Sequence, residues 1–380
     1  MFEQLAQTMT NLPGGVFMWS TFIFIIVVSA LVFFHELGHY LAARSVGVYV
    51  ETFSIGFGRE IFGWDDSQGT RWKVSILPLG GYVKMYGMSG EARPEDIPED
   101  RQHEAFVLKS VLRRMWVVFA GPLANFVLAF VVLAGMFYFS GERRILTEVG
   151  DVAEGMPAAA ANLQPGDEIL AVNNQPVQYW DEMVPLIQED GENPVMLEIY
   201  RPQADTTLTV TIKPEKVEVK NILGETSTMY QVGIRAGASF ERQPHGLLTS
   251  MALGVERTYQ QTTLILQAVW RMISGQMRAD VGGPLTIGKV AGEQATMGLE
   301  SLLVFMAFIS INLGLINLFP VPVLDGGHLV YFAIEGLLGR PLTETAQEIG
   351  NRIGLTLIMM LMVFAFYKDI MNVVMPIFTS

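Results

Sequence analysis

The sequence predicts a membrane α-helical bundle of about four transmembrane helices, with a membrane-associated β-hairpin element and one small inserted α+β domain. Half of the 380 residues are apolar and only 17% are charged, a composition too hydrophobic for an ordinary soluble domain. The apolar residues gather in long uncharged runs, each near the roughly 18 to 20 residues that a helix needs to cross about 30 Å of hydrocarbon. Between these runs, stretches with strand-type alternation predict the hairpin and the inserted domain.

Three apolar runs predict transmembrane helices directly, at residues 16–34, 115–141 and 301–324. A fourth run covers residues 353–367 and continues past Lys368 and Asp369 into residues 370–378. We expect it to form a spanning helix whose two charged side chains snorkel to the interface. The first run stays in the protein as a helix, because residues 1–18 lack the basic start of a cleaved signal peptide.

These patterns divide the chain into seven segments. Residues 1–47 form the first transmembrane helix, 48–110 the β-element and an acidic linker, and 111–141 the second helix. Residues 142–214 form the inserted domain, and 215–298 an extracytoplasmic and interfacial segment. Residues 299–328 form the third helix, and 329–380 a loop and the fourth helix.

Basic residues predict the orientation in the membrane. None precedes the first helix, whereas ten lie between residues 44 and 114, and Arg340 and Arg352 lie between the third and fourth helices. The positive-inside rule places these segments in the cytoplasm and residues 142–300 outside it. The formal net charge of −13 argues against nucleic acid as a partner, and the absence of cysteine excludes disulfides and thiolate metal ligands.

Residues 48–86 show strand-like alternation, with Trp72, Val74 and Ile76 set against polar neighbours and several glycines nearby. We expect a β-hairpin here, either a simple cytoplasmic one or a membrane-associated one. Residues 91–104 contain six acidic residues, two basic residues and two prolines, which predicts a solvated linker.

The inserted domain has expected strands at residues 145–149, 169–172, 195–201 and 206–212, with a helix at 179–189. Residues 156–173, in which a short helix and a Gly166–Asp167 turn lead into a strand, resemble the PDZ signature. The alternative is another small β domain that binds no peptide. Residues 247–273 have mixed helical periodicity interrupted by charges and predict an interfacial helix rather than a span.

The first apolar run ends in an HExxH motif. Its spacing puts His35 and His39 on one helix face, where they can bind zinc, and the adjacent Glu36 can act as a general base. Such a motif also occurs by chance on surface helices. At the end of a transmembrane helix, however, unsatisfied ionisable side chains are costly, so a functional role is favoured.

A catalytic zinc needs a third protein ligand. His103 lies in the charged linker and His245 in the soluble part, which leaves Asp325 or His328 after the third apolar run. Asp325 could instead be a plain helix cap. The same run ends in an NxxPxPxxDG pattern that contains Asn317, Pro320 and Pro322, and its prolines break backbone hydrogen bonds at membrane depth. The alternative for these residues is a kink that serves packing only.

HExxH in the first helix together with NxxPxPxxDG in the third resembles the site-2 protease family. The resemblance covers nearly the whole chain, including Gly121, Pro122 and Asn125 in the second helix and the stretch 282–284. Members of the family with two tandem PDZ domains are well known, whereas this sequence shows one.

The resemblance implies an intramembrane zinc endopeptidase. His35, His39 and Asp325 would bind Zn²⁺, Glu36 would be the general base, and Asn317, Pro320 and Pro322 would position the substrate, while His328 would lie outside the ligand set. Residues 71–79 would pair with an extended substrate by β-addition.

The same resemblance implies a multi-pass protein of the bacterial inner membrane with its PDZ domain outside the cytoplasm. Its partners would be lipid, single-pass transmembrane substrates such as anti-sigma factors that have already lost their ectodomain, and a peptide or periplasmic ligand of the PDZ domain.

Two other functions fit parts of the sequence. A catalytically idle membrane scaffold would use only the inserted domain, but it would have no need for buried charges. A zinc transporter would also place His and Asp in helices, but it would not need a glutamate next to a ligand. Metal analysis and a cleavage assay separate the three functions.

Overall fold

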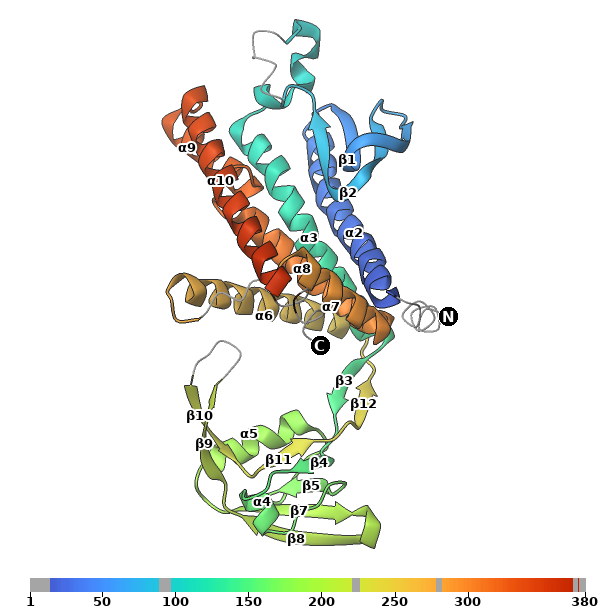
Figure 1. Ribbon diagram of the computed structural model, residues 1–380, viewed down its shortest axis with the longest axis vertical. Coiled ribbons are helices and arrows are strands. Elements are labelled where there is room, and N and C mark those ends of the chain that lie inside the picture. Colours follow the sequence, from blue (N-terminus) through green and yellow to red (C-terminus); the bar gives the residue numbers. More distant parts are fainter. Residues whose placement is uncertain (1–13, 89–96, 221–225, 278–281, 372–374, 376–380) are drawn as a thin grey trace. The chain divides into compact units, whose positions relative to one another are not determined.

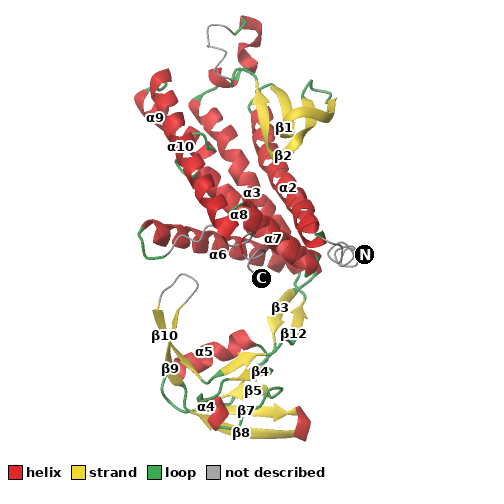
Figure 2. Cartoon of the chain, in the orientation of Figure 1, coloured by secondary structure: helices red, strands yellow, loops and turns green. Residues whose placement is uncertain are grey.

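The computed structural model describes residues 14–371 except 89–96, 221–225 and 278–281, together with Met375. The chain forms two compact units, which are treated separately below. The first comprises residues 1–134, 251–265 and 279–380, and the second comprises residues 135–250 and 266–278. Figure 1 labels the elements, and Figure 2 distinguishes the helical first unit from the strand-rich second one.

Four of the described helices are long and apolar enough to cross a membrane, as the sequence predicts. They are α2 (Gly15–Ser45), α3 (Val111–Phe139), α8 (Leu299–Leu318) and α10 (Glu344–Asp369). The amphipathic helix α6 (Leu247–Ile273), which the sequence predicts to be interfacial, is not among them.

One face of α2 is buried along most of its length. Its buried side chains recur every four residues, namely Trp19, Ile23, Val27, Leu31, His35 and His39. The N-terminal part of this stripe packs on α7 (Pro284–Thr296) and α8 through Ala291, Ala295 and Leu302. Because residues four apart share a helix face, the same packing turns both histidines inward.

The helices α2 and α3 approach very closely beside this stripe. A Cβ atom at Gly38 would lie 2.7 Å from the Cβ of Ala124 and would also collide with the carbonyl of Ala120. Only glycine fits at this position, which brings the backbone of α3 within reach of the histidine rings.

The hairpin is formed by β1 (Val50–Asp65) and β2 (Arg71–Met85), which pair antiparallel. Both strands bend sharply, so residues 50–55 pair with 81–85 along one edge, and residues 52–55 also pair with 71–74 along the other. Residues 57–65 then pair with 71–77. Residues 71–74, part of the segment 71–79 that is expected to pair with a substrate strand, thus have strand partners on both edges. Within the described residues, 81–84 have one strand partner each and keep a free edge.

Aromatic side chains attach the hairpin to α2. Phe53 is fully buried, stacks on Trp72 at a centroid distance of 4.2 Å, and meets the edge of Tyr40 of α2 at 5.9 Å. At the turn, burial raises the pKa of Asp66. Hydrogen bonds from the Trp72 indole, the Thr70 and Gln68 amides and the Tyr40 hydroxyl outweigh burial and lower that pKa to about 2.

The described residues that follow the hairpin are partly helical. Two short 3-10 helices occupy Glu99–Glu104 and Phe106–Leu108, and Phe106 joins a core cluster with Met85 and Val118. The acidic linker predicted at residues 91–104 falls partly on 89–96, outside the described residues.

The predicted third helix, residues 299–328, is in fact two helices. The helix α8 ends at Leu318, and α9 (Asp325–Leu338) begins at the predicted metal ligand. Pro320 and Pro322 have no backbone N–H to continue a helix, and the residue before each proline is disfavoured in the α region. Val323 in this turn has φ +84°, a strained conformation for a β-branched residue.

Helix α9 is fixed to the start of α3 by a buried ion pair. The Arg114 guanidinium donates to both carboxylate oxygens of Glu335, at 3.1 and 2.5 Å, and lies 4.8 Å from the Phe332 ring centroid. Bidentate pairs of this kind fix orientation as well as distance. The pair therefore constrains the direction in which α9 carries Asp325.

Asp369, expected to snorkel, is instead completely buried. Its carboxylate accepts hydrogen bonds from the backbone N–H groups of Gly283, Leu285 and Thr286, at 2.8 to 3.2 Å, and from the Thr286 hydroxyl at 2.5 Å. These donors lie at the start of α7, where helical N–H groups lack partners and the helix dipole favours an anion. The end of α10 is thereby joined to α7.

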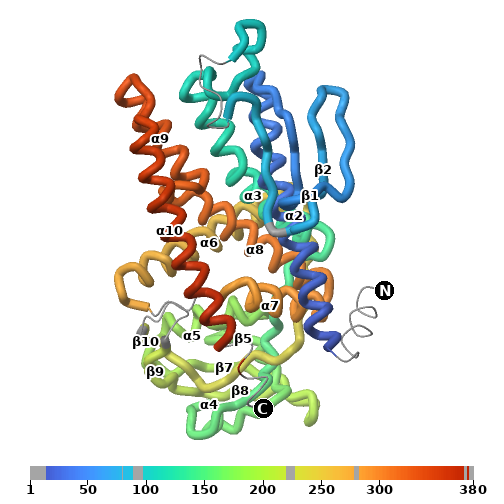
Figure 3. The backbone as a smooth tube through the Cα atoms, turned by 45° about the horizontal axis from the view of Figure 1, so that its top comes forward, coloured from blue at the N-terminus to red at the C-terminus, as the bar shows by residue number. Residues whose placement is uncertain are grey.

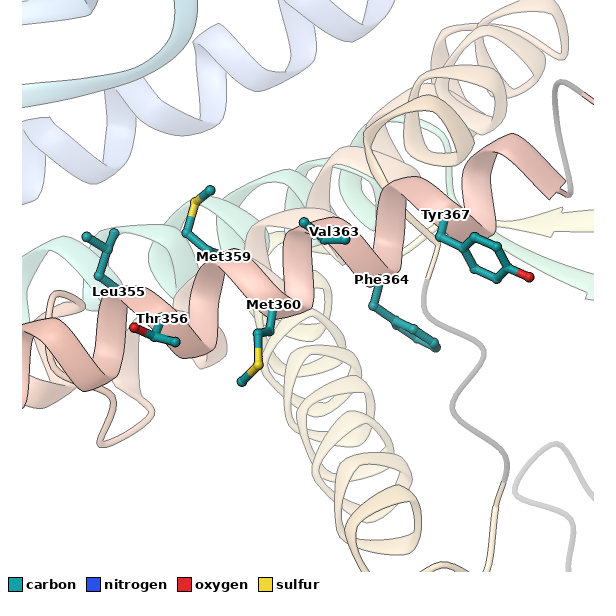
Figure 4. Close-up of a pocket in the computed structure, with 7 residues that line it drawn as sticks. All are labelled: Leu355, Thr356, Met359, Met360, Val363, Phe364 and Tyr367. Atoms are coloured by element: carbon teal, nitrogen blue, oxygen red, sulfur yellow. The ribbon is translucent and has the colours of Figure 1, made fainter.

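Between its ends α10 makes few contacts with the protein. Figure 3 traces the backbone from α9 into α10, and toward the middle of α10 Gly354 lies directly against Pro322 of the turn. A shallow groove further along is lined by side chains of α10 alone, including Met359, Met360 and Phe364 (Figure 4). Such an exposed apolar surface on a spanning helix suits contact with lipid.

The second unit is built around a four-stranded antiparallel sheet in the order β6-β5-β7-β8. The strands are β5 (Glu168–Val172), β6 (Gln175–Pro176), β7 (Val195–Arg201) and β8 (Thr206–Ile212). The helices α4 (Pro157–Ala160) and α5 (Trp180–Asp190) contribute to its core, which centres on Ile169, Leu197 and Met183. The strands β5, β7 and β8 and both helices lie where the sequence predicts them, whereas β6 was not predicted. The strand expected at residues 145–149 is divided between β3 (Glu142–Ile145) and β4 (Val149–Val152).

Further strands continue this unit beyond residue 214, where the sequence-based boundary was set. β11 (Ile234–Ala236) pairs with β4 (Val149–Val152), β12 (Phe240–Gln243) pairs with β3 (Glu142–Ile145), and β9 (Glu215–Lys220) pairs with β10 (Thr226–Gln231). The pattern was missed because these strands are short and mostly exposed.

The Gly166–Asp167 turn is held by a buried carboxylate. Asp167 is fully buried and receives two hydrogen bonds of 2.8 Å from Arg201 and one from the Gln164 amide. Burial raises the pKa of Asp167, but these charged and backbone donors outweigh it and hold the pKa below its ordinary value.

The Asp369 contacts lead to a test of stability. We expect Asp369→Ala to lower the free energy of unfolding by about 3 kcal/mol or more, because it leaves buried N–H groups of α7 without an acceptor. Thermal unfolding of the purified protein in detergent measures the loss.

Glu348→Ala is the matched control, since it removes an exposed carboxylate of the same helix that pairs with Arg352 at 2.7 Å. Its effect should stay within about 0.5 kcal/mol. Equal losses of stability in the two variants would show that the hydrogen bonds between Asp369 and the start of α7 do not stabilise the fold.

Candidate metal centre

The two histidines of the HExxH motif are carried by the buried face of α2. His35 and His39 are each 8% exposed, and their rings lie edge to face with centroids 4.8 Å apart. Their Nε2 atoms are 3.2 Å apart. Two nitrogen atoms at this distance, on one face of a helix, form half of a metal site.

Asp325, the first residue of α9, completes the group. Its Oδ2 atom is 3.2 Å from His35 Nε2 and 3.5 Å from His39 Nε2. Four ligands held at zinc-ligand bond lengths of about 2.0 to 2.1 Å in a tetrahedron lie about 3.3 Å apart. The donor type and spacing of these three residues therefore fit zinc, and they leave the fourth position of a catalytic site.

The turn before α9 brings Asp325 to this point. Gly326 lies so close to the carbonyl oxygens of Leu318 and Phe319 that a side chain would collide with them. The start of α9 is thus folded tightly onto the end of α8.

His39 is oriented by the backbone of α3. Its Nδ1 lies 2.9 Å from the carbonyl oxygen of Val117, which can only accept, so Nδ1 carries a proton and Nε2 is the nitrogen that faces His35 and Asp325. The ring lies against Gly121, where any side chain would collide with it.

Glu36 lies between the metal-ligand residues and the hairpin. It is partly exposed and directly follows His35 in α2. A Cβ atom at Gly81 of β2 would lie 3.1 Å from its Cγ. The glycine leaves room for the glutamate next to the free edge of the hairpin.

Of the two candidates for the third ligand, the structure brings Asp325 to the histidines. Among the described residues, the group that could hold a metal consists of His35, His39 and Asp325, and His328 is not part of it. His328 is partly buried, with its ring edge to face with that of Tyr331. His245 bonds to Glu142 in the second unit.

The three residues expected to position the substrate lie along the chain next to the site. Asn317 is in the last turn of α8, eight residues before Asp325, and Pro320 and Pro322 are in the turn that follows. Pro322 packs on Gly354 of α10, so it has a packing role there.

The sequence analysis did not predict the groups that contact Nδ1 of His35 and His39. Asn125 of α3 is fully buried, and its Nδ2 lies 3.1 Å from His35 Nδ1. The only sequence signal for it is the motif that begins at Gly121 and Pro122. A backbone partner such as Val117 leaves no such signal.

Comparison with known proteins identifies the family. The sequence profile described as Peptidase family M50 matches residues 23–361. A Rhizobium meliloti protein whose name describes a zinc metalloprotease is 37% identical, with 91% of this chain and 95% of the relative covered. The metalloprotease MmpA of Caulobacter vibrioides is 35% identical, with 90% of this chain and 93% of the relative covered.

The regulator of sigma E protease of Haemophilus influenzae is 31% identical, with 94% of this chain and 99% of the relative covered. Among solved structures, the PDZ domain of an SdrC-like protein from Listeria monocytogenes matches 26% of this chain and 88% of its own length, with 18% identity and a TM-score of 0.19. A likeness at that level assigns no fold. The family match extends over most of the chain, so the chain belongs to peptidase family M50, the site-2 protease family of zinc metalloproteases.

Proposed function

We propose that this protein is an intramembrane zinc endopeptidase that cuts transmembrane segments of other membrane proteins. The observation that carries the proposal is the convergence of His35 and His39, on a helix apolar enough to span a membrane, with Asp325 at the start of α9, with donor atoms 3.2 to 3.5 Å apart. The names of the similar proteins support zinc as the metal.

The three donors would hold the zinc ion. When bound, zinc supplies Lewis acidity, which polarises the substrate carbonyl and lowers the pKa of a water molecule. Glu36 accepts a proton from the attacking water and passes it to the amine that leaves as the peptide C–N bond breaks. The partial exposure of Glu36 lets both water and substrate reach it.

A transmembrane substrate must unfold locally, because the carbonyls of a regular helix are hydrogen-bonded and shielded by side chains. The free edge of residues 81–84 offers backbone groups to an extended segment, and Gly81 places this edge against Glu36. We therefore assign substrate pairing to this edge, in place of residues 71–79.

Residues 142–243 form the proposed PDZ domain, on the extracytoplasmic side of a bacterial inner membrane. The helix and the Gly166–Asp167 turn that precede β5 support this assignment, as does the distribution of basic residues for the orientation. The resemblance to sigma-E-regulating proteases supports anti-sigma factors, trimmed beforehand, as substrates.

Replacement of the general base is the most direct test. Glu36→Gln should abolish cleavage of a single-pass reporter substrate and leave zinc content unchanged, because the amide keeps the shape of the side chain but cannot accept a proton. Gel-based cleavage and metal analysis of the purified variant measure both effects. Substantial remaining turnover would contradict the assigned role.

Asp325→Ala should lower both zinc content and cleavage, because it removes one of three protein ligands. His328→Ala is its control, and we expect that variant to keep its zinc. Stoichiometric zinc in Asp325→Ala and reduced zinc in His328→Ala would transfer the ligand role to His328.

Asn317→Ala should keep zinc and cut turnover by about 10²- to 10³-fold if its amide donates to the developing oxyanion. Asn312→Ala provides the matched control, because the Asn312 side chain bonds to the Phe308 carbonyl of its own helix. If Asn317→Ala kept normal zinc content, stability and cleavage rates, Asn317 would have only a packing role.

A further inference from the structure

Asn125 is a buried amide that the proposed chemistry does not yet use. It lies on α3, one turn after Pro122, and has no exposed surface. Its Nδ2 is 3.1 Å from Nδ1 of His35, the ring nitrogen that does not face the metal position. Asn125 therefore contacts a ligand of the site from behind and lies outside the ligand group itself.

The tautomer of His35 decides what this contact means. A histidine that binds a metal through Nε2 carries its proton on Nδ1, and this N–H needs an acceptor. An amide nitrogen facing Nδ1 offers only another donor. The oxygen of the same amide, Asn125 Oδ1, is buried and has no hydrogen-bond partner among the described residues.

A half turn of the amide resolves the conflict. The oxygen and nitrogen of an asparagine amide occupy nearly the same space and are assigned from the hydrogen bonds around them. With Oδ1 toward His35, the amide accepts the Nδ1 proton of that histidine. The amide nitrogen then takes the unpartnered position that Oδ1 had, so the number of unpartnered polar atoms is unchanged. Metal binding thus selects the orientation in which Asn125 accepts.

The other histidine has the same arrangement. His39 Nδ1 lies 2.9 Å from the Val117 carbonyl, also on α3. The two acceptors belong to residues eight apart on α3, and the two histidines are four apart on α2. The Ser310 hydroxyl of α8 donates to the backbone carbonyl of Asn125 at 2.8 Å and helps to fix this part of α3.

We propose that Asn125 is a positioning residue of the zinc site, which accepts the Nδ1 proton of His35 and thereby fixes the tautomer and ring orientation that metal binding needs. The inference rests on the proposed function, because it takes His35 as a zinc ligand.

The test compares two substitutions at this position. Asn125→Leu keeps the approximate volume but has no acceptor, and it should raise the zinc dissociation constant by about 10- to 100-fold. Asn125→Asp keeps an acceptor oxygen, and its zinc dissociation constant should be no higher than about threefold above that of the unmodified protein. Competition with a chelator, on purified protein in detergent without substrate, measures the constants.

A second readout follows the geometry of the site. The visible spectrum of the Co²⁺-loaded protein should change in Asn125→Leu and be preserved in Asn125→Asp. Asn312→Leu makes the same chemical change on α8 away from the histidines, and it should alter neither the constant nor the spectrum.

Measurement on the unmodified protein guards against a variant that fails to fold. Nitrogen NMR of the zinc-loaded protein with labelled histidine should show a protonated Nδ1 on His35, and a proton on Nε2 would overturn the proposal. Unchanged zinc affinity in Asn125→Leu, or equal loss in both variants, would overturn it too. Wild-type zinc affinity in Asp325→Ala would instead count against the proposed function.

Discussion

The close approach of α2 and α3 is the constraint on which the metal centre depends. Gly38 on one helix and Gly121 on the other leave no room for side chains, so backbone and imidazole meet directly. Interhelical contacts of this kind rely on packing between small residues, since lipid is as apolar as the side chains. A wider spacing would take both Nδ1 atoms away from their acceptors and leave the rings free to rotate.

The position of Asp325, the proposed third ligand, depends on a different set of contacts. Asp325 comes from a helix that starts after a tight turn and is tied to α3 by the Arg114–Glu335 pair. Strain at Val323 shows that the turn is held in place by its surroundings. Rigid support at both ends of a short helix gives the donor atom a defined position, as metal sites require.

The sequence predicted much of this arrangement, and the misses have physical causes. Long apolar runs predicted four helices, and the spacing of His35 and His39 predicted a shared face, because both signals are local. Residue spacing alone left Asp325 and His328 open as the third ligand, and the family resemblance favoured Asp325, because the path of the turn is not a local signal. Asp369 looked like a membrane-interface charge, since its partners lie more than eighty residues away. Short exposed strands such as β11 carry too little hydrophobic pattern to be recognised.

The way α10 is fastened bears on the turn that carries Asp325. Its 26 residues extend about 39 Å, but the uncharged apolar stretch 353–367 covers only about 22 Å of this length. The helix is held at two points, in its middle by Gly354 against Pro322 of the turn and at its end by Asp369 on α7. A change in the direction of α10 would therefore act on both contacts, one of which lies in the turn that precedes Asp325.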